Sequence, residues 1–407
     1  MPALAAFSLL AGALTATAGA AATGGLDIAI GKAVFDRMWV QAPASTKHAD
    51  GLGPLFAARS CASCHAGSGG RTTFRLGRDD PASHPGLVVR FGDAAGAPDP
   101  VYGAELQPQG VSGAAGEGRA VVSFATASIG RIATPEWSVA DWGYGQPAAT
   151  TRLSPRVAPS LAGVGLIERV DEAAILARED ADDRDGDGVS GRANRIVMPA
   201  GPAIGRFGWK AAEPTLEAQA ASAFALDIGL STALRPDSAG DCTPEQTACR
   251  AAPMGADPGE TEVAEPLMTR LVAYLDHLAP PPAASYNPRG ARLFASVGCG
   301  ACHAPSLALK GGGEANAYTD LLLHDMGPDL DGGMGEGSAA PSEWRTAPLW
   351  GLSRALAQGS GLLHDGRAAS VRDAVAWHGG EAAGARSRFA ELSESERNAL
   401  LEFVNRL

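Results

Sequence analysis

Cys-Ala-Ser-Cys-His at residues 61–65 and Cys-Gly-Ala-Cys-His at residues 299–303 are the two stretches that decide how this chain folds. Two thiols separated by two residues can bond to the vinyl groups on one edge of a porphyrin, and the next histidine then lies beneath the ring. Zinc half-sites and thioredoxin-like pairs also use C-x-x-C, but neither requires a histidine directly after it. We expect two covalent haem c groups, with these residues as thioether anchors and proximal iron ligands: Cys61, Cys64 and His65, and Cys299, Cys302 and His303.

The N-terminus has the composition of a secretion signal. Residues 2–22 are apolar and alanine-rich, contain no acidic residue, and include Ala18-Gly19-Ala20, which suits cleavage before Ala21. The usual basic segment is missing, so an unstructured or membrane-anchoring end is the alternative. Because haem is attached to c-type cytochromes outside the cytoplasm, we expect residues 1–20 to be a removed signal peptide. The mature protein is then periplasmic or otherwise exported, soluble, and without a membrane span.

Charge and the remaining cysteines narrow the class of protein further. The 33 basic and 45 acidic residues give a net charge of −12, which disfavours nucleic acid and suits a basic or dipolar electron-transfer partner. Cys242 and Cys249 lie outside the haem motifs and flank a polar, proline-containing stretch. In an exported protein we expect them to form a disulfide, and a second redox site is the alternative.

The pattern of apolar residues predicts a mainly α fold of two cytochrome c-like haem domains. Residues 71–147 hold short apolar runs separated by glycine, proline and aspartate, so the N-terminal domain is expected to be elaborated with loops and short β-strands. The proline run at 279–283 divides an N-terminal haem domain (21–283) from a C-terminal cytochrome c domain (284–407). Periodicity and capping residues predict helices over residues 30–40, 215–229, 260–278, 288–297, 370–377 and 393–407.

The segment from residue 290 to 407 resembles the bacterial dihaem cytochrome c peroxidase superfamily. Members carry an F-T-D…F-H-N-x-G pattern after the second haem motif, which residues 318–320 and 324–327 match. A P-T-L-R-N segment is matched loosely at 345–350, and F-H-D-G-S followed by a helix is matched at 363–367.

Three longer stretches resemble one branch of that superfamily. They are Asp-Gly-Asp-Gly-Val-Ser-Gly-Arg-Ala-Asn at 185–194, Gly-Arg-Phe-Gly-Trp-Lys-Ala at 205–211 and Trp-His-Gly-Gly-Glu-Ala at 377–382. The branch is the dihaem oxidoreductase family of peroxidase-like proteins, which is often labelled thiol oxidoreductase. The resemblance covers residues 45–407.

The resemblance implies a second axial ligand for the C-terminal haem. His378 stands where the peroxidases have methionine and a related branch has tyrosine, and bis-histidine ligation would lower the haem potential. A helix cap or a packed side chain is the alternative role for His378, with Met326 and Met334 as reserve ligands. His324 and His364 match family histidines that bond to propionates or to backbone near the haem.

For the N-terminal haem, the resemblance implies a catalytic site on an open face. Trp209 matches a tryptophan that relays electrons between the haems, and Gln219 lies in a T-L-E-x-Q-A match. Asp227 is the acidic residue nearest to the position of the family's acid/base glutamate, but it lies two residues closer to Gln219 than the family spacing. The alternative is that Asp227 is a carboxylate at a helix end or in a salt bridge. His84 and Met198 are candidates for a sixth ligand that would close this face.

An acidic loop is a candidate calcium site. Asp183, Asp185 and Asp187 have the D-x-D-x-D-G spacing of EF-hand-type loops, although Asn194 replaces the glutamate at the twelfth position. The resemblance favours a structural calcium ion because superfamily members bind calcium between their haem domains. An acidic glycine turn without a metal is the alternative.

The sequence therefore predicts an exported, haem-dependent oxidoreductase with peroxidase-like chemistry. The C-terminal haem would accept electrons from a small donor protein of cytochrome c or cupredoxin type, and the N-terminal haem would reduce peroxide or another small oxidant. Two alternatives are a non-enzymatic dihaem electron carrier with both irons six-coordinate, and an oxidase of a protein, thiol or ferrous substrate. No cysteine pair remains for direct thiol–disulfide exchange.

Overall fold

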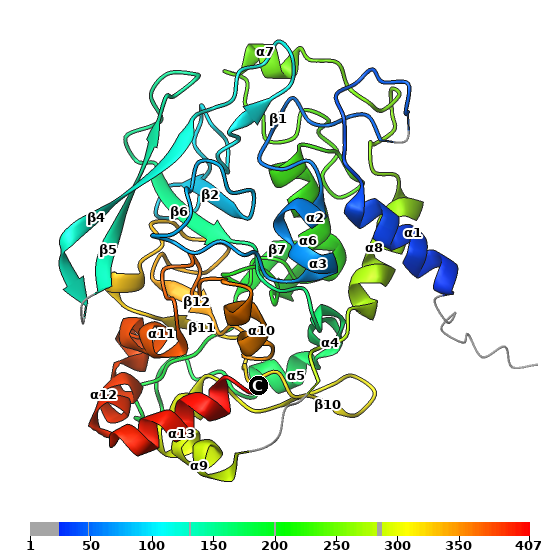
Figure 1. Cartoon of the computed structure of the whole chain (residues 1–407). Coiled ribbons are helices and arrows are strands. Elements are labelled where there is room, and N and C mark those ends of the chain that lie inside the picture. The colour runs from blue at the N-terminus through cyan, green and yellow to red at the C-terminus, as the bar shows by residue number, and fades with distance from the viewer. Residues whose placement is uncertain (1–23, 48, 130–131, 199–200, 283–286) are drawn as a thin grey trace, which may run out of the picture.

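The computed structural model describes residues 24–47, 49–129, 132–198, 201–282 and 287–407 (Figure 1). The predicted signal peptide, residues 1–20, lies outside this part of the chain, and so does the predicted domain boundary at residues 283–284. None of the helices in the described ranges is long and apolar enough to cross a membrane.

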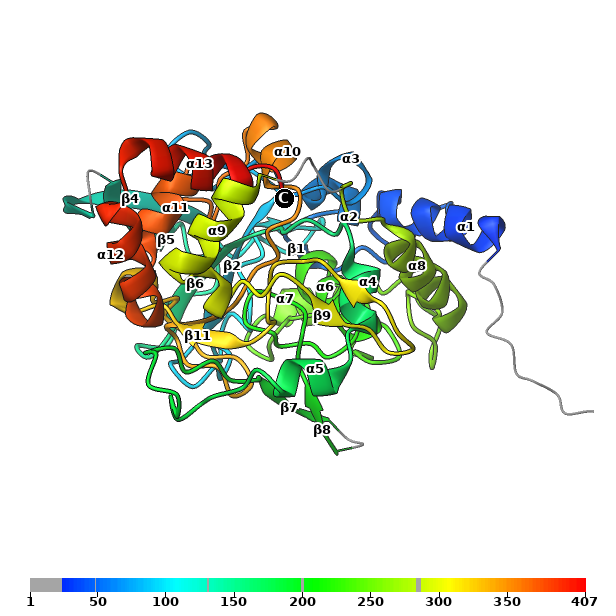
Figure 2. The same cartoon turned by 90° about the horizontal axis from the view of Figure 1, so that it is seen from below.

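Two groups of helices lie apart from each other. In both views α1 and α8 pack together on one side, and the C-terminal helices α9, α12 and α13 lie on the other (Figures 1 and 2). The α-helices are α1 (Gly25–Asp36), α2 (Cys61–Cys64), α3 (Ala66–Gly69), α4 (Val164–Arg169), α5 (Glu172–Leu176), α6 (Leu216–Ala223), α7 (Thr247–Arg250), α8 (Glu265–His277), α9 (Pro288–Val297), α10 (Leu352–Ala357), α11 (Val371–Trp377), α12 (Ala383–Glu391) and α13 (Glu394–Val404). Shorter turns are η1 (Phe224–Ile228, a π-helix) and the 3-10 helices η2 (Cys299–Ala301), η3 (Pro328–Leu330) and η4 (Gly380–Ala382).

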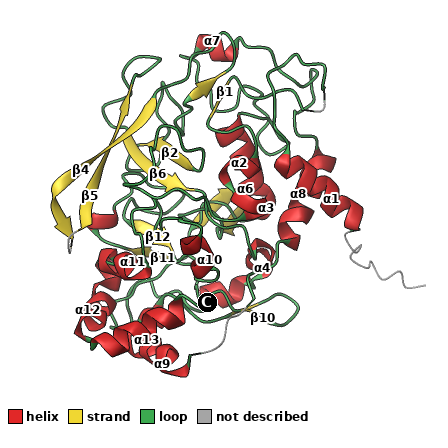
Figure 3. Cartoon of the chain, in the orientation of Figure 1, coloured by secondary structure: helices red, strands yellow, loops and turns green. Residues whose placement is uncertain are grey.

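The strands pair two by two and do not build a larger sheet in the described ranges. Figure 3 shows them as short arrows scattered among loops, with the long β4–β5 hairpin projecting at one edge. The antiparallel pairs are β1 (Leu55–Phe56) with β3 (Gln109–Gly110), β2 (Leu87–Gly92) with β6 (Arg152–Val157), β4 (Arg119–Ile129) with β5 (Ile132–Ala140), β7 (Arg195–Met198) with β8 (Gly201–Ile204), β9 (Leu307–Ala308) with β10 (Glu314–Ala315), and β11 (Leu323–Asp325) with β12 (Glu343–Arg345).

The prediction of a mainly α fold of two cytochrome c-like domains is wrong. The structure is 30% helical and 18% strand, and strands follow the second haem motif as well as the first. The physical reason lies in the 52 glycines and 28 prolines, which interrupt helices and terminate strands after a few residues. Much of the chain is therefore held by turns and long-range contacts instead of by regular elements.

Several local predictions are confirmed. Helix α9 has the predicted bounds, α11 begins one residue after its predicted start at the N-cap Ser370, and α13 begins with the predicted capping box between Ser393 and Glu396. Cys242 and Cys249 form the predicted disulfide. In each case the determinant is a few residues in one short stretch.

The two haem segments share a core across the predicted boundary. The largest buried cluster joins Phe35 and Trp39 from the start of the chain with Leu307 and Leu321, which follow the second motif. Backbone bonds join the segments too: Val157 N donates to His364 O at 2.7 Å. Residues from both haem segments therefore pack into one buried cluster. The division at residue 283 stays a prediction.

Candidate haem sites

The first motif forms one turn of helix that presents both thiols. Ser60 caps α2, and its hydroxyl accepts a hydrogen bond from Ser63 N at 3.1 Å. Cys61 and Cys64 stand at the two ends of this turn and form no disulfide. Burial raises the pKa of Cys61 to about 12, so this thiol is neutral in the folded chain. Two unpaired thiols on one turn fit attachment to one porphyrin edge.

His65 is held as a neutral imidazole with one nitrogen left over. Its Nδ1 donates to Pro159 O at 2.9 Å, which leaves Nε2 as the acceptor. Burial lowers the pKa of His65 to about 4, because a charged ring loses its hydration there. Metal-bound histidines have this arrangement, in which a backbone carbonyl orients the ring and selects the tautomer.

A cavity of about 600 Å³ lies beside this motif, and Cys61, Cys64 and His65 contribute to its wall. The volume is in the range of cofactor and ligand sites in proteins. The three predicted catalytic residues line the same cavity, namely Trp209, Gln219 and Asp227. The fold thus brings together, in one wall, residues that the sequence separates by up to 166 positions (227 minus 61).

Asp227 is positioned by an irregular turn. It belongs to the π-helix η1, which continues α6, and such π turns often occur at functional sites. The backbone N–H groups of Ala57 and Ala58 donate to Asp227 O at 2.8 and 2.9 Å, and this ties η1 to the chain just before the first motif. Burial raises the pKa of the Asp227 carboxyl. Asp227 is the second-last residue of η1, as the helix-terminal alternative expects, and the charge of Arg90 acts against the rise in its pKa, so the catalytic role of Asp227 stays a prediction.

The cavity wall also holds charged residues that the sequence did not single out. Glu105, Arg90, Arg156 and Glu336 line it, and all four come from segments without a recognisable motif. Arg156 pairs with Glu336 at 2.8 Å, and Arg90 lies 3.8 Å from Glu105 and 3.6 Å from Glu336. No short sequence pattern could have found them, because only the tertiary fold makes them neighbours.

Trp209 lies in the cavity wall and in an aromatic cluster behind it. Its indole N–H donates to Val157 O at 2.8 Å, and the Arg71 guanidinium lies 5.5 Å from the centre of its ring. The same cluster contains Trp344, which stacks on His364 with ring centres 3.9 Å apart. His364 is 4% exposed in this stacked position, and its role of bonding to propionate or backbone stays a prediction.

The second motif repeats the arrangement of the first on a different turn. It begins with η2, and the Nδ1 of His303 donates to Tyr318 O at 3.0 Å. His378 caps the end of α11, and its Nδ1 donates to Ala374 O at 2.7 Å. Burial, with a smaller contribution from the nearby His378, lowers the pKa of His303 to about 4. Both imidazoles therefore keep Nε2 for a metal, and they lie close enough to interact electrostatically.

His324 does not have its predicted role beside the second motif. It lies between two carboxylates, with Nε2 2.9 Å from Asp320 and Nδ1 2.7 Å from Glu381. These partners raise the pKa of His324 well above its usual value despite burial. The Sγ of Cys302 is 3.5 Å from the same ring. With both nitrogens bonded to acids, His324 is a buried cation that supports the motif.

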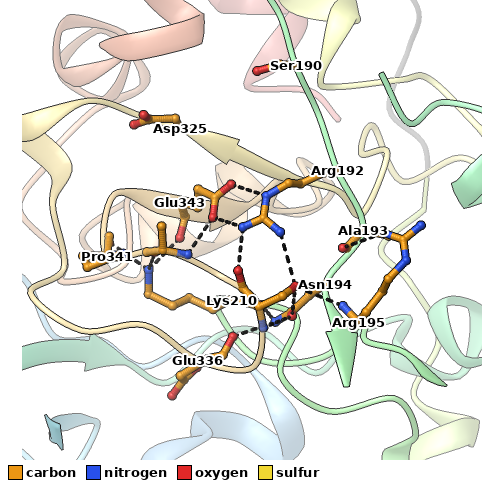
Figure 4. A network of polar contacts seen from close by, with 12 residues as sticks. Ser190, Arg192, Ala193, Asn194, Arg195, Lys210, Asp325, Glu336, Pro341 and Glu343 are labelled. Carbon is orange, nitrogen blue, oxygen red and sulfur yellow. Dashed lines mark hydrogen bonds and ion pairs between the residues drawn. The ribbon is translucent and has the colours of Figure 1, made fainter. Parts of the chain in front are cut away.

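Figure 4 shows a polar network that joins the acidic-loop segment to the C-terminal part of the chain. Arg192 pairs with Glu343, and Asn194 Nδ2 donates to Lys210 O and Glu336 O at 2.7 and 2.9 Å. The Lys210 ammonium donates to the carbonyls of Ala340, Pro341 and Glu343. Lys210, which belongs to the 205–211 stretch, is fully buried. Burial lowers its pKa to about 7.

The three aspartates of the predicted calcium loop converge. One carboxylate oxygen from each of Asp183, Asp185 and Asp187 lies within 4.8 Å of the others, and the loop is largely exposed. Just after it, Ser190 donates to Glu381 through N and Oγ, at 2.9 and 3.1 Å. The loop is thus attached to the residue that contacts His324.

The other residues that were predicted as possible axial haem ligands lie in different parts of the structure. Met334 is buried and lines the cavity of the first motif, although it was considered for the second haem. Met326 packs against the cluster that contains Trp209. His84 is bonded through both nitrogens, to Thr73 Oγ1 at 3.4 Å and from Gly86 N at 3.2 Å, so it is poorly placed as a ligand.

Comparisons with known proteins agree with the C-terminal motifs. A family model described as "Di-haem oxidoreductase, putative peroxidase" matches residues 148–407, which include the second motif, Trp209 and Asp227. No curated protein matches the chain. Among solved structures, hydrazine synthase of Kuenenia stuttgartiensis is similar over 94% of this chain and 88% of that chain, with 14% identity and a TM-score of 0.40. That likeness is too low to carry an argument about chemistry.

Proposed function

Because this chain belongs to the family described as "Di-haem oxidoreductase, putative peroxidase", we propose that it is an exported c-type oxidoreductase that reduces peroxide or another small oxidant at its first haem. The observation that carries the proposal is the cavity beside Cys61, Cys64 and His65, whose wall contains the acid Asp227 and the amide Gln219. Peroxide reduction needs room for a small oxidant at iron and a group that moves a proton between its oxygens. The cavity and the position of Asp227 in its wall support both requirements.

The residues around the first motif divide this work among them. Cys61, Cys64 and His65 would hold the haem, which supplies redox-active iron when bound. Asp227 keeps part of its surface open to the cavity and would take up and return a proton at Oδ, and Gln219 offers an amide donor and acceptor. The buried wall excludes bulk water, so these interactions are stronger than in solution.

We place electron entry at the second motif. His303 and His378 would hold its iron, and a haem iron held by two histidines has no free position for an oxidant. Trp209 connects the two sites, because it lines the first cavity and packs in a cluster with Met326, two residues from His324. An oxidisable tryptophan between two redox sites shortens the distance that an electron must cross.

Electron paramagnetic resonance of the ferric protein, with cyanide titration, tests this assignment. We expect one low-spin haem from the second site and one haem with a high-spin component that binds cyanide. Two low-spin haems that ignore cyanide in the ferric and half-reduced states would contradict the peroxidase-like function and favour an electron carrier.

His378→Ala extends the test to the second site. The variant should convert the low-spin signal to high-spin, because the iron loses one of two nitrogen ligands. His84→Ala is the matched control, since His84 is bonded to Thr73 and Gly86 and should leave both signals unchanged. An unchanged low-spin signal in His378→Ala would refute the ligand assignment.

We also propose that Asp183, Asp185 and Asp187 bind a structural calcium ion. Their convergent carboxylates support it, and Ser190 joins the loop to Glu381 beside the second motif. Titration calorimetry of chelator-treated protein should detect calcium binding, with at least about tenfold weaker affinity in Asp185→Asn because one charged ligand is lost. Equal affinity in the two proteins would contradict the site.

The partner that we propose is a small basic or dipolar electron-donor protein of cytochrome c or cupredoxin type. The net charge of −12 supports it, since opposite charges accelerate encounter. Donor turnover should therefore slow steeply as salt is added, and a rate independent of ionic strength would contradict this choice of partner.

A further inference from the structure

Two carboxyl groups meet in the wall of the first cavity. Glu105 follows β2 in the chain, Asp227 lies on η1, and their side chains are hydrogen-bonded to each other. Glu105 is 1% exposed, whereas Asp227 keeps part of its surface open to the cavity. Asp227 can therefore touch a bound molecule, and Glu105 stands behind it.

The surrounding charges do not neutralise this pair. Arg90 is the cation that faces it, 3.8 Å from Glu105, but Arg90 also interacts with Glu336 at 3.6 Å. Asp241 adds a further carboxylate that accepts hydrogen bonds from Ala104 N and Glu105 N at 2.7 and 3.0 Å. The other charged groups of this wall are more distant from the pair or already engaged: Arg156 pairs with Glu336, and Arg235 pairs with Glu213.

The contact between the two carboxyls argues that the pair carries a proton. The Oε1 of Glu105 receives no donor from any described backbone or side-chain group. Two ionised carboxylates cannot bond to each other, because each only accepts. A bond between Glu105 and Asp227 requires a proton on one of them, and that proton satisfies the otherwise unpaired oxygen.

We propose that Glu105 is a positioning residue of the peroxidase-like site, which shares one proton with Asp227 and so holds the cavity-facing carboxyl ready to take up and return a proton. The inference rests on the function proposed above. It gives the oxidant site an acid pair formed by two distant segments of the chain. When Asp227 accepts a proton from a bound molecule, Glu105 stays neutral and its hydrogen bond holds the Asp227 carboxyl in place.

The pH dependence follows from the charges. Burial raises the pKa of both carboxyls; the charge of Asp227 raises that of Glu105 further, whereas the hydrogen bond from Glu105 lowers that of Asp227. The pair therefore keeps its shared proton at pH values where isolated carboxyls are ionised, and loses it as the pH rises through the raised value. The site should lose proton-dependent chemistry on the alkaline side of that transition.

Infrared titration of Glu105→Gln, Asp227→Asn and the double variant tests the shared proton directly. The wild-type protein should show a neutral-carboxyl band that either single substitution removes, because the new amide donates to the remaining carboxylate and leaves it ionised. The double substitution should remove no further band. Glu213→Gln is the matched control, since Glu213 lines the same cavity but pairs with Arg235, and it should keep the band. Two separate bands lost one by one would overturn the proposal.

The ferric spectrum of the first haem gives a second readout. In Glu105→Gln its pH transition should move to lower pH by about one unit or more, and Glu105→Asp should restore at least part of the shift. A variant that only disturbed packing would not be rescued in this way, and an unmoved transition in Glu105→Gln would refute the role of Glu105. Because neither readout uses turnover, a shared proton in a protein that does not reduce peroxide would defeat the proposed function and leave this inference intact.

Discussion

Replacing Cys61 and Cys64 by alanine should reduce peroxide turnover to background, whereas replacing Cys299 and Cys302 should abolish turnover with a donor protein but keep cyanide binding. The reason is that Gln219 and Asp227 line the cavity beside the first motif, whereas His303 of the second motif has a second histidine, His378, nearby. Each double variant should lose one covalent haem. Intact mass reports both the number of haems and removal of residues 1–20. Peroxide turnover and cyanide binding then distinguish the contribution of one site from that of the other.

The matched control for these variants is Cys242→Ala with Cys249→Ala. It removes the same number of cysteines, but from the disulfide, so both haems should remain attached. If the chain without Cys61 and Cys64 still bound cyanide and reduced peroxide, the roles of the two sites would have to be exchanged. If both motif variants kept two haems, covalent attachment itself would be wrong.

Asp227→Asn should lower kcat/KM for peroxide at neutral pH by about 10²–10⁴, the usual contribution of a positioned proton-transfer group. Asparagine keeps the size of the side chain and its place on η1, but it cannot take up and return a proton. The measurement is steady-state peroxide reduction with a small-molecule electron donor, so that protein docking does not enter.

Glu213→Gln is the control for this variant as well, because it changes an acid in the same wall that does not contact Asp227. The loss in Asp227→Asn should exceed that in Glu213→Gln by at least about tenfold. Equal losses would mean that Asp227 contributes only to the charge of the cavity. The cyanide-bound spectrum should be present in both variants, which shows that the haem pocket is intact.

Local signals predicted the parts of this protein that depend on neighbouring residues. The spacing of Cys61 and Cys64 places both thiols on one helical turn, and Ser393 with Glu396 caps α13 as expected. The fold class was wrong because helical periodicity in a few segments was extended to the whole chain. The glycine- and proline-rich stretches instead form six separate two-stranded sheets in the described ranges.

The site residues that were predicted lie in local sequence motifs, whereas the one that was missed depends on long-range contacts. Trp209, Gln219 and Asp227 could be proposed because they lie in motifs, and the structure places all three in one cavity. Glu105 has no motif, and it becomes relevant because long-range contacts carry its strand segment against η1. Lys210 has a motif, yet its ammonium points into the network with Glu343 and not into the cavity.

The sequence by itself determined which residues can hold two haems, since haem attachment needs only two thiols and a histidine within five positions. Which residues surround the first motif was decided by the tertiary structure. There, packing between distant segments builds the cavity beside His65 and brings Glu105 to Asp227. Haem attachment depends on the spacing of residues in one short stretch. Burial, cavity volume and the interaction between two carboxyls depend instead on residues that are far apart in the sequence, and only folding brings these together.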